Sequence, residues 1–181
     1  MKIGLKNKGF SLIETIVYMV ILTTIFTIVI RGLNERREKQ DFLIQKRNIS
    51  QFIRKVQQYS QHNRKEYILY FKISENKVYF IDIENNKEEI IGEIDISKNI
   101  SYMTNNKNRN EDFKRKTTVE GNFEKGFSIY LLNGKGNKIY YRISTNTINA
   151  ARYPIISIYK SKRPINTSDD YLKSNLWEEE L

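Results

Sequence analysis

The longest apolar stretch of the chain lies near its N-terminus. Residues 10–30 read FSLIETIVYMVILTTIFTIVI and contain one charged residue, Glu14. At about 1.5 Å per residue, a helix of this length spans a bilayer core of about 30 Å. The segment is apolar on nearly every side, whereas a helix in a globular core shows a single apolar stripe. The pattern therefore predicts a membrane-spanning helix over residues 10–30.

The next segment, residues 31–64, keeps a helical pattern but is amphipathic. Apolar residues recur at three- and four-residue steps, which places on one face Phe42, Ile49, Phe52, Ile53, Val56 and Tyr59. No proline or glycine lies between Leu33 and Gly92. We therefore predict one continuous helix from Ser11 to about His62, whose second half packs its apolar stripe against a sheet.

From residue 65 onward, short runs rich in β-branched and aromatic residues predict strands. These runs cover residues 67–73, 77–83, 89–96, 100–103, 127–132, 138–144 and 154–159. Hairpin turns are predicted at residues 74–76 and 133–137, a polar loop at 104–118, and a loosely held polar tail at 160–181. The pattern as a whole predicts an α+β fold, in which one long N-terminal helix packs on an antiparallel β-sheet body formed by residues 65–159.

The composition narrows the possible chemistry. The chain has 181 residues, a formal net charge of +10, one histidine and no cysteine. The lack of cysteine excludes disulfides, cysteine-ligated zinc, iron–sulfur clusters and thiol nucleophiles. His62 lies in a polar stretch, which predicts a surface residue. The sequence shows no Ser/His/Asp set and no convincing carboxylate pair, so we expect no catalytic residue, no cofactor and no metal site.

Two other motifs favour ordinary surface roles. The Gly134-Lys135-Gly136 loop lies between two predicted strands and lacks the GxxxxGK[ST] spacing of a phosphate loop, so it predicts a turn. The acidic residues of the C-terminal region could bind a cation, but they lack calcium-loop spacing and favour a solvated tail. These residues are Asp169, Asp170, Glu178, Glu179 and Glu180.

The N-terminal segment has two simpler interpretations. A secretory signal peptide has an apolar core of about 7–15 residues followed by a small-x-small cleavage site, whereas Arg31, Gly32 and a charged run follow here. An uncleaved single-span anchor fits better, but it does not explain Glu14. A carboxylate at membrane depth costs about 2.5–3.5 kcal/mol and normally has a partner or a function. The alternative is a glutamate close enough to the helix end to reach the headgroups.

The first fourteen residues give a more specific indication. Residues 1–9 are short and basic, with Lys2, Lys6 and Lys8 and no acidic residue. The sequence KGFSLIE at residues 8–14 overlaps the end of this basic segment and leads into the apolar helix. This arrangement resembles the N-terminal signal of type IV prepilins and type II secretion pseudopilins. The resemblance covers roughly the first thirty residues.

The resemblance implies a processing pathway. Residues 1–9 would be a leader peptide that prepilin peptidase removes after Gly9, and Phe10 would become the N-methylated N-terminus. Glu14 would form an assembly salt bridge with the terminal amine of an adjacent subunit. The implied partners are other pilin or pseudopilin subunits, the inner-membrane assembly platform and membrane lipid.

The resemblance also implies a location. The chain would be a single-pass protein of a bacterial cytoplasmic membrane, with its N-terminus inside and its body outside, and then part of an extracytoplasmic filament. Charge alone slightly favours the opposite orientation, because the three leader lysines are outnumbered on the far side by Arg31, Arg36, Arg37 and Lys39. The orientation therefore depends on the resemblance. The segment also lacks the proline that many major pilins carry near the end of this helix.

Two functions are compatible with these features. The first is a structural subunit without enzymatic activity, a minor pilin or pseudopilin of a type IV pilus, type II secretion or DNA-uptake filament. The alternative is a competence-type pilin whose basic body binds DNA directly. Aromatic and basic residues that would suit stacking on single-stranded DNA are Tyr140, Tyr141, Arg142, Tyr153, Tyr159 and Lys160.

Overall fold

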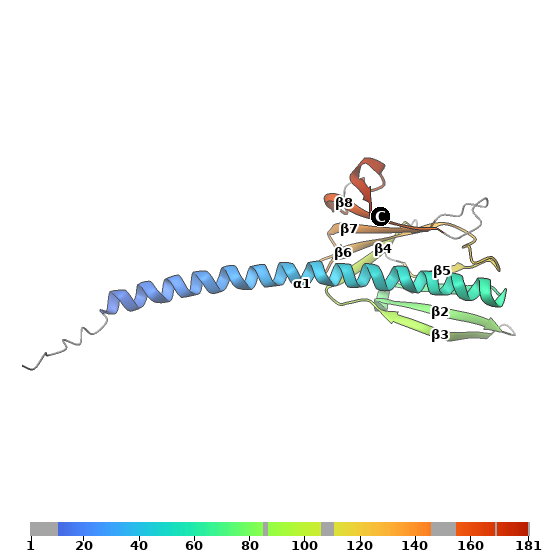
Figure 1. Ribbon diagram of the computed structural model, residues 1–181, viewed down its shortest axis with the longest axis horizontal. Coiled ribbons are helices and arrows are strands. Elements are labelled where there is room, and N and C mark those ends of the chain that lie inside the picture. The colour runs from blue at the N-terminus through green and yellow to red at the C-terminus, as the bar shows by residue number, and fades with distance from the viewer. Residues whose placement is uncertain (1–10, 85–86, 106–110, 146–154, 169, 181) are drawn as a thin grey trace, which may run out of the picture. The chain divides into compact units, whose positions relative to one another are not determined.

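The computed structural model describes residues 11–84, 87–105, 111–145, 155–168 and 170–180. The chain divides into two compact units, Met1–Lys39 and Gln40–Leu181. One helix, α1 (Leu12–Asn63), starts in the first unit and continues into the second (Figure 1). The prediction of a single long helix is confirmed, with both ends within one residue of the expected positions.

The C-terminal end of α1 has an identifiable stop signal. Arg64 adopts a positive φ of 51°, and the Lys65 N–H donates to the Ser60 carbonyl at 3.3 Å. A left-handed residue followed by this six-to-one hydrogen bond is the arrangement of a Schellman motif. It turns the chain directly into the first strand, β1 (Tyr67–Lys72).

The second unit contains two antiparallel sheets. The first has the order β3-β2-β1-β5 and consists of β1 with β2 (Lys77–Glu84), β3 (Lys87–Asp95) and β5 (Phe113–Lys116). The second has the order β4-β6-β7-β8-β9 and consists of β4 (Ile100–Thr104), β6 (Phe127–Asn133), β7 (Lys138–Thr145), β8 (Ile156–Asn166) and β9 (Trp177–Glu179). An α+β fold with a long helix packed on antiparallel sheets is therefore confirmed, although the body has two sheets rather than one.

The two predicted hairpins are both present. β1 pairs with β2 through a short 3-10 helix, Ile73–Glu75, and Asn76 completes the turn with a φ of 53°. β6 pairs with β7, and Gly136 (φ 66°) donates its N–H to the Asn133 carbonyl at 2.7 Å. The Gly134–Gly136 segment is thus a turn, as the sequence predicts.

Two segments that the sequence assigns to loops contain strands. β5 lies within the predicted polar loop at 104–118, of which residues 106–110 fall outside the described residues. β8 extends to Asn166 and pairs with β9, so the prediction of a loosely held tail from Lys160 is wrong. Both strands are polar on their exposed sides, and neighbouring strands rather than their own composition hold them in the sheets.

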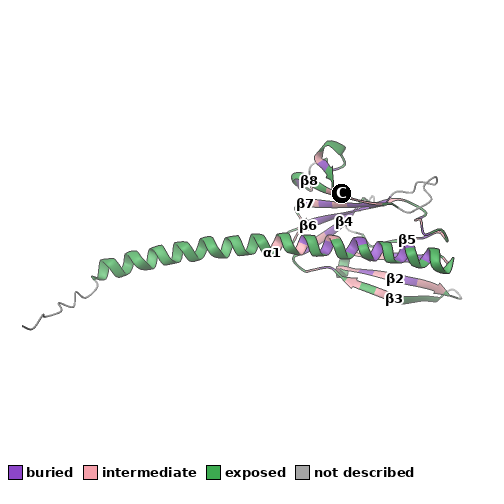
Figure 2. Ribbon diagram, in the orientation of Figure 1, coloured by how far each residue is buried: buried purple, intermediate pink, exposed green. Residues whose placement is uncertain are grey.

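The main core lies between the second half of α1 and both sheets. Five residues of the predicted helical stripe are buried there: Phe42, Ile49, Phe52, Ile53 and Val56 (Figure 2). They pack against strand residues that include Leu69, Phe71, Phe80, Ile129 and Ile143. Tyr59 was predicted to share this face but is exposed, and its ring edge contacts Phe80 at a centroid distance of 5.4 Å.

A second, smaller core lies on the other face of the second sheet. It contains Met103, Tyr130, Leu132, Ile139, Ile165, Tyr171 and Trp177. The Trp177 Nε1–H donates to the Tyr171 carbonyl at 2.8 Å, and the rings of Trp177 and Tyr171 both contact the Tyr130 ring. The C-terminal segment therefore covers apolar sheet surface that α1 does not reach.

Candidate processing and assembly site

The start of α1 places Glu14 beside Ser11. The Ser11 N–H donates to Glu14 Oε2 at 2.9 Å, and the Glu14 N–H donates to Ser11 Oγ at 3.2 Å. This reciprocal pair is a capping box, which satisfies two of the N–H groups that a helix start leaves without partners. The negative charge of Glu14 also lies in the first turn, where the helix dipole favours it.

The capping box explains how the carboxylate can be tolerated near the apolar segment. A carboxylate offers about four lone-pair positions, and the described contacts of Glu14 occupy one of them with a backbone donor. The remaining positions can accept a cation without breaking the cap. Gly9 and Phe10, where cleavage and methylation are predicted, lie outside the described residues, as do Lys2, Lys6 and Lys8.

Ser11 caps the start of α1 together with Glu14, a role that was not predicted from the sequence. Its signal was present, because Ser11 and Glu14 have the S-x-x-E spacing that marks a capping box before an apolar run. In the sequence this spacing lies within the KGFSLIE motif at residues 8–14. The structure shows that the same two residues also build the helix start.

The apolar half of α1 has the properties of a membrane segment. It contains the one stretch, among the described residues, that is long and apolar enough to cross a bilayer, and none of this window is buried within the protein. The hydroxyls of Thr23, Thr24 and Thr27 donate to backbone carbonyls of the preceding turn at 2.8–3.0 Å. Polar side chains that satisfy their donors within the helix are compatible with a hydrocarbon environment.

The other residues singled out from the sequence lie apart from this site. His62 is exposed near the end of α1. Glu180 forms an ion pair with Lys46 of α1, and Glu178 lies opposite Lys160 across the β8–β9 pair. Among the described residues, no group of three or more histidine, cysteine or acidic side chains could hold a metal ion.

The proposed DNA-stacking residues do not form one exposed surface. Tyr141 is buried, and Tyr140 packs against Phe42 at a ring-centroid distance of 4.8 Å. Arg142 lies over the Tyr159 ring at 5.3 Å, whereas Tyr153 falls outside the described residues. Two of the tyrosines therefore contribute to the core instead of a stacking platform.

Comparison with known proteins identifies the N-terminal segment. A family model described as the prokaryotic N-terminal methylation motif matches residues 4–30. No curated protein and no solved structure matches the chain. The matched segment contains the predicted cleavage position, the capping box and the whole apolar stretch at residues 10–30. Residues 4–30 therefore carry the signature of type IV pilins and pseudopilins.

Proposed function

We propose that the chain is a structural subunit, a minor pilin or pseudopilin, which prepilin peptidase cleaves after Gly9. Phe10 then becomes the N-methylated terminus, and the subunit joins a filament through the apolar half of α1. The observation that carries this proposal is the methylation motif at residues 4–30, which includes a glutamate in the first helical turn. The motif points to a structural role rather than to catalysis.

Cleavage after Gly9 would create a positive charge next to the capping box. The new amine would belong to Phe10, and the residue after it, Ser11, already donates its N–H to Glu14. Within one chain, Glu14 therefore has a hydrogen-bond donor but no fixed counter-charge among the described residues. The terminal amine of an adjacent subunit would supply this charge, and in an apolar environment such a charge-assisted bond is stronger than a neutral one.

This pairing would also fix the position of one subunit relative to the next. A buried carboxylate without a cation is costly, so an axial offset that leaves Glu14 unpaired would be disfavoured. Under this proposal the chain is anchored in a bacterial cytoplasmic membrane, with its N-terminus inside and its body outside. Its partners are prepilin peptidase, other pilin-like subunits, the membrane assembly platform and lipid.

Substitution of Glu14 separates processing from assembly. We expect Glu14→Gln and Glu14→Leu to be cleaved normally, because Gly9 is unchanged. The amount of each variant in the sheared filament fraction should fall at least about tenfold. Glu14→Gln keeps an oxygen that can accept the Ser11 N–H, so it isolates the role of the charge from that of the cap. Loss of one hydrogen bond to a charged group costs about 1.5–3 kcal/mol, which corresponds to tenfold or more.

The matched control is Glu35→Gln, an exposed glutamate of the same helix. Immunoblots of filament and membrane fractions from cells that contain the cognate machinery report both steps. If Glu14→Gln enters filaments as well as the control does, the charge pairing is wrong. A variant that is no longer cleaved would instead show that Glu14 acts in processing.

A further inference from the structure

Strand β3 forms an open edge of the first sheet. It has nine residues and pairs with β2 on one side, and no other described strand pairs with its second side (Figure 1). The edge contains no proline that would block pairing. An unpaired edge of this kind is a template on which a further extended chain can add.

The open edge carries exposed apolar side chains. Ile90 is 57% exposed and Ile91 is 40% exposed, and they are adjacent on the strand. Ile90 lies opposite Ile81 of β2, and Ile91 occupies the bulge between the Phe80–Gly92 and Ile81–Ile90 pairs. Because Ile81 is itself buried, Ile90 extends an apolar row to the edge, where a further strand could continue it.

The edge is also acidic, in a chain whose net charge is +10. β3 contains one lysine and four acidic residues, which are Glu88, Glu89, Glu93 and Asp95. Lys114 forms an ion pair with Glu88 at 2.6 Å, and Lys77 contacts Glu93 at 3.2 Å and Asp95 at 3.4 Å. The described residues provide no such ion pair for Glu89.

Among the acidic residues of β3, Glu89 is the one that a nearby cation would stabilise most. It lies directly opposite Asp82 of β2, and like charges in this position destabilise a strand pair. Lys65 contacts Asp82 at 2.6 Å but forms no described ion pair with Glu89. A basic side chain on an added strand would face Glu89 from its open side and relieve this repulsion.

A second copy of β3 is a poor occupant of the edge. Pairing two β3 strands would bring together two acidic edges and add like-charge repulsion. A strand that alternates basic and apolar residues would instead place its basic residue beside Glu89 and its apolar residue beside Ile90. These two neighbours on β3 point to opposite faces of the sheet.

We propose that the β3 edge is a strand-addition site for a basic, apolar-alternating segment of a different protein chain. Backbone hydrogen bonds to β3 provide the docking, while Glu89 and Ile90 select the incoming residues. The site belongs to the second unit and does not depend on the processing or assembly of the N-terminal segment.

The test is a titration of the full chain, labelled with nitrogen-15 in detergent micelles, with the peptide KVKVKV. We expect saturable binding, chemical-shift changes centred on β3 and slower hydrogen exchange of its amides. The peptide EVEVEV reverses the charge, and KVKPKV keeps the charge but removes one backbone donor and disfavours an extended pairing. Both control peptides should bind at least tenfold more weakly.

The protein variants are Glu89→Lys and the control Glu120→Lys, which makes the same charge change at an exposed turn residue. Glu89→Lys should raise the dissociation constant at least tenfold, whereas Glu120→Lys should leave it within twofold. Equal binding of KVKVKV and KVKPKV, or no binding at about millimolar peptide, would overturn the proposal. If hydrogen exchange of the β3 amides slows as the protein concentration rises in the absence of peptide, a second copy of the chain occupies the edge instead.

Discussion

At the scale of single residues, Glu14 has one observed contact, with Ser11, and one proposed role in assembly. Its hydrogen bond from the Ser11 N–H helps to start α1, and its free acceptor positions leave room for a cation from another chain. The Ser11–Glu14 pair thus reduces the free-energy cost of placing a carboxylate near the apolar segment, without a contact from another chain. The assembly salt bridge remains a proposal, because the adjacent subunit would contribute its second half.

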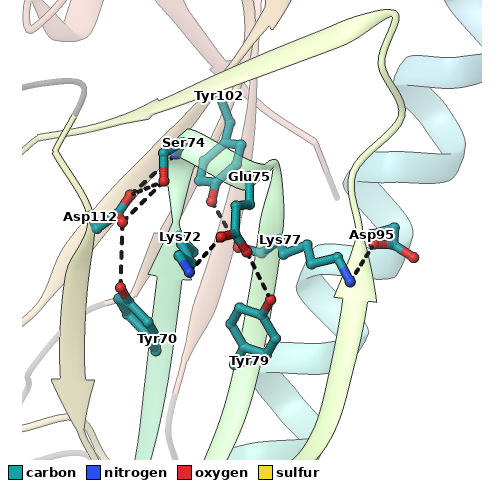
Figure 3. Close-up of polar contacts among 9 residues, drawn as sticks. All are labelled: Tyr70, Lys72, Ser74, Glu75, Lys77, Tyr79, Asp95, Tyr102 and Asp112. Atoms are coloured by element: carbon teal, nitrogen blue, oxygen red, sulfur yellow. Dashed lines mark hydrogen bonds and ion pairs between the residues drawn. The ribbon is translucent and has the colours of Figure 1, made fainter.

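A second residue-scale feature lies in the turn after β1. Glu75 contacts Lys72 at 2.5 Å and accepts a hydrogen bond from the Tyr79 hydroxyl at 3.2 Å (Figure 3). The hydrogen bond from Lys72, with a smaller contribution from Tyr79, lowers the pKa of Glu75 from its usual value of 4.5. Asp112 accepts the Ser74 N–H at 3.2 Å and so holds the same turn.

This lowered pKa predicts a pH-dependent contribution to stability. Because the folded-state pKa lies below the unfolded value, the Glu75 contribution is present above about pH 4.5 and is lost as the pH falls through the folded pKa. Glu75→Gln should therefore be less stable than the native chain at pH 7 and equal to it well below pH 4. Urea unfolding at both pH values measures the difference.

The control for this experiment is Glu120→Gln, which removes an exposed glutamate of another turn. It should change the free energy of unfolding little at either pH, because exposed groups away from specific contacts contribute little. A Glu75→Gln deficit that is the same at pH 7 and pH 3 would contradict the assigned role of the ion pair.

At the scale of elements, periodicity determines what the sequence can predict. α1 and the two hairpins have clear patterns, and the structure confirms them. β5 and β9 have only four and three residues, which is too short for alternation to be recognised. Phe113 of β5 stacks on Phe71 at 4.6 Å, and Trp177 of β9 enters the second core. Tertiary contacts of this kind, rather than local pattern, define these two strands.

The segment that follows β5 provides an element-scale prediction. Gly121 has a φ of 83°, and a Cβ atom there would lie 2.6 Å from the Gln57 carbonyl oxygen of α1. Gly121→Ala combines a strained backbone with an overlap against helix backbone. We expect a loss of about 2–3 kcal/mol in the free energy of unfolding, measured by urea titration.

The matched control for this substitution is Gly92→Ala in β3. A Cβ atom at Gly92 would make ordinary contacts of 3.7–3.8 Å with Phe52 and Phe80, and its φ is not in the left-handed region. Its effect should stay below about 1 kcal/mol. Equal effects of the two substitutions would show that the Gly121 segment does not pack closely on α1.

At the scale of the whole molecule, both faces of the second sheet are covered. α1 packs on one face, and the C-terminal segment packs on the other through Tyr171 and Trp177. The ion pair between Lys46 of α1 and Glu180 connects these two covering elements. The sequence did not reveal this second core because its residues are widely separated along the chain and the segment that closes it is mostly polar.

The second core makes Trp177 a principal stabilising residue of the C-terminal segment. Trp177→Ala should lower the free energy of unfolding by about 3–5 kcal/mol, as expected for loss of a large buried aromatic side chain. The control Leu172→Ala alters a side chain of the same segment that is 62% exposed, so we expect a change within about 0.5 kcal/mol. Urea unfolding measures the free energy of unfolding of both variants. If both substitutions change it by a similarly small amount, the C-terminal segment contributes little to stability.

The most direct test of the central claim is the identity of the mature N-terminus. The full chain would be produced together with its cognate prepilin peptidase, beside a Gly9→Val control, and analysed by intact mass and N-terminal peptide mapping. We predict that the native chain begins at N-methylated Phe10 and that the control remains uncut. A chain that retains residues 1–9, or that is cut near residue 31, would contradict the pilin-like account and leave Glu14 as an unexplained charge in an ordinary anchor or signal peptide.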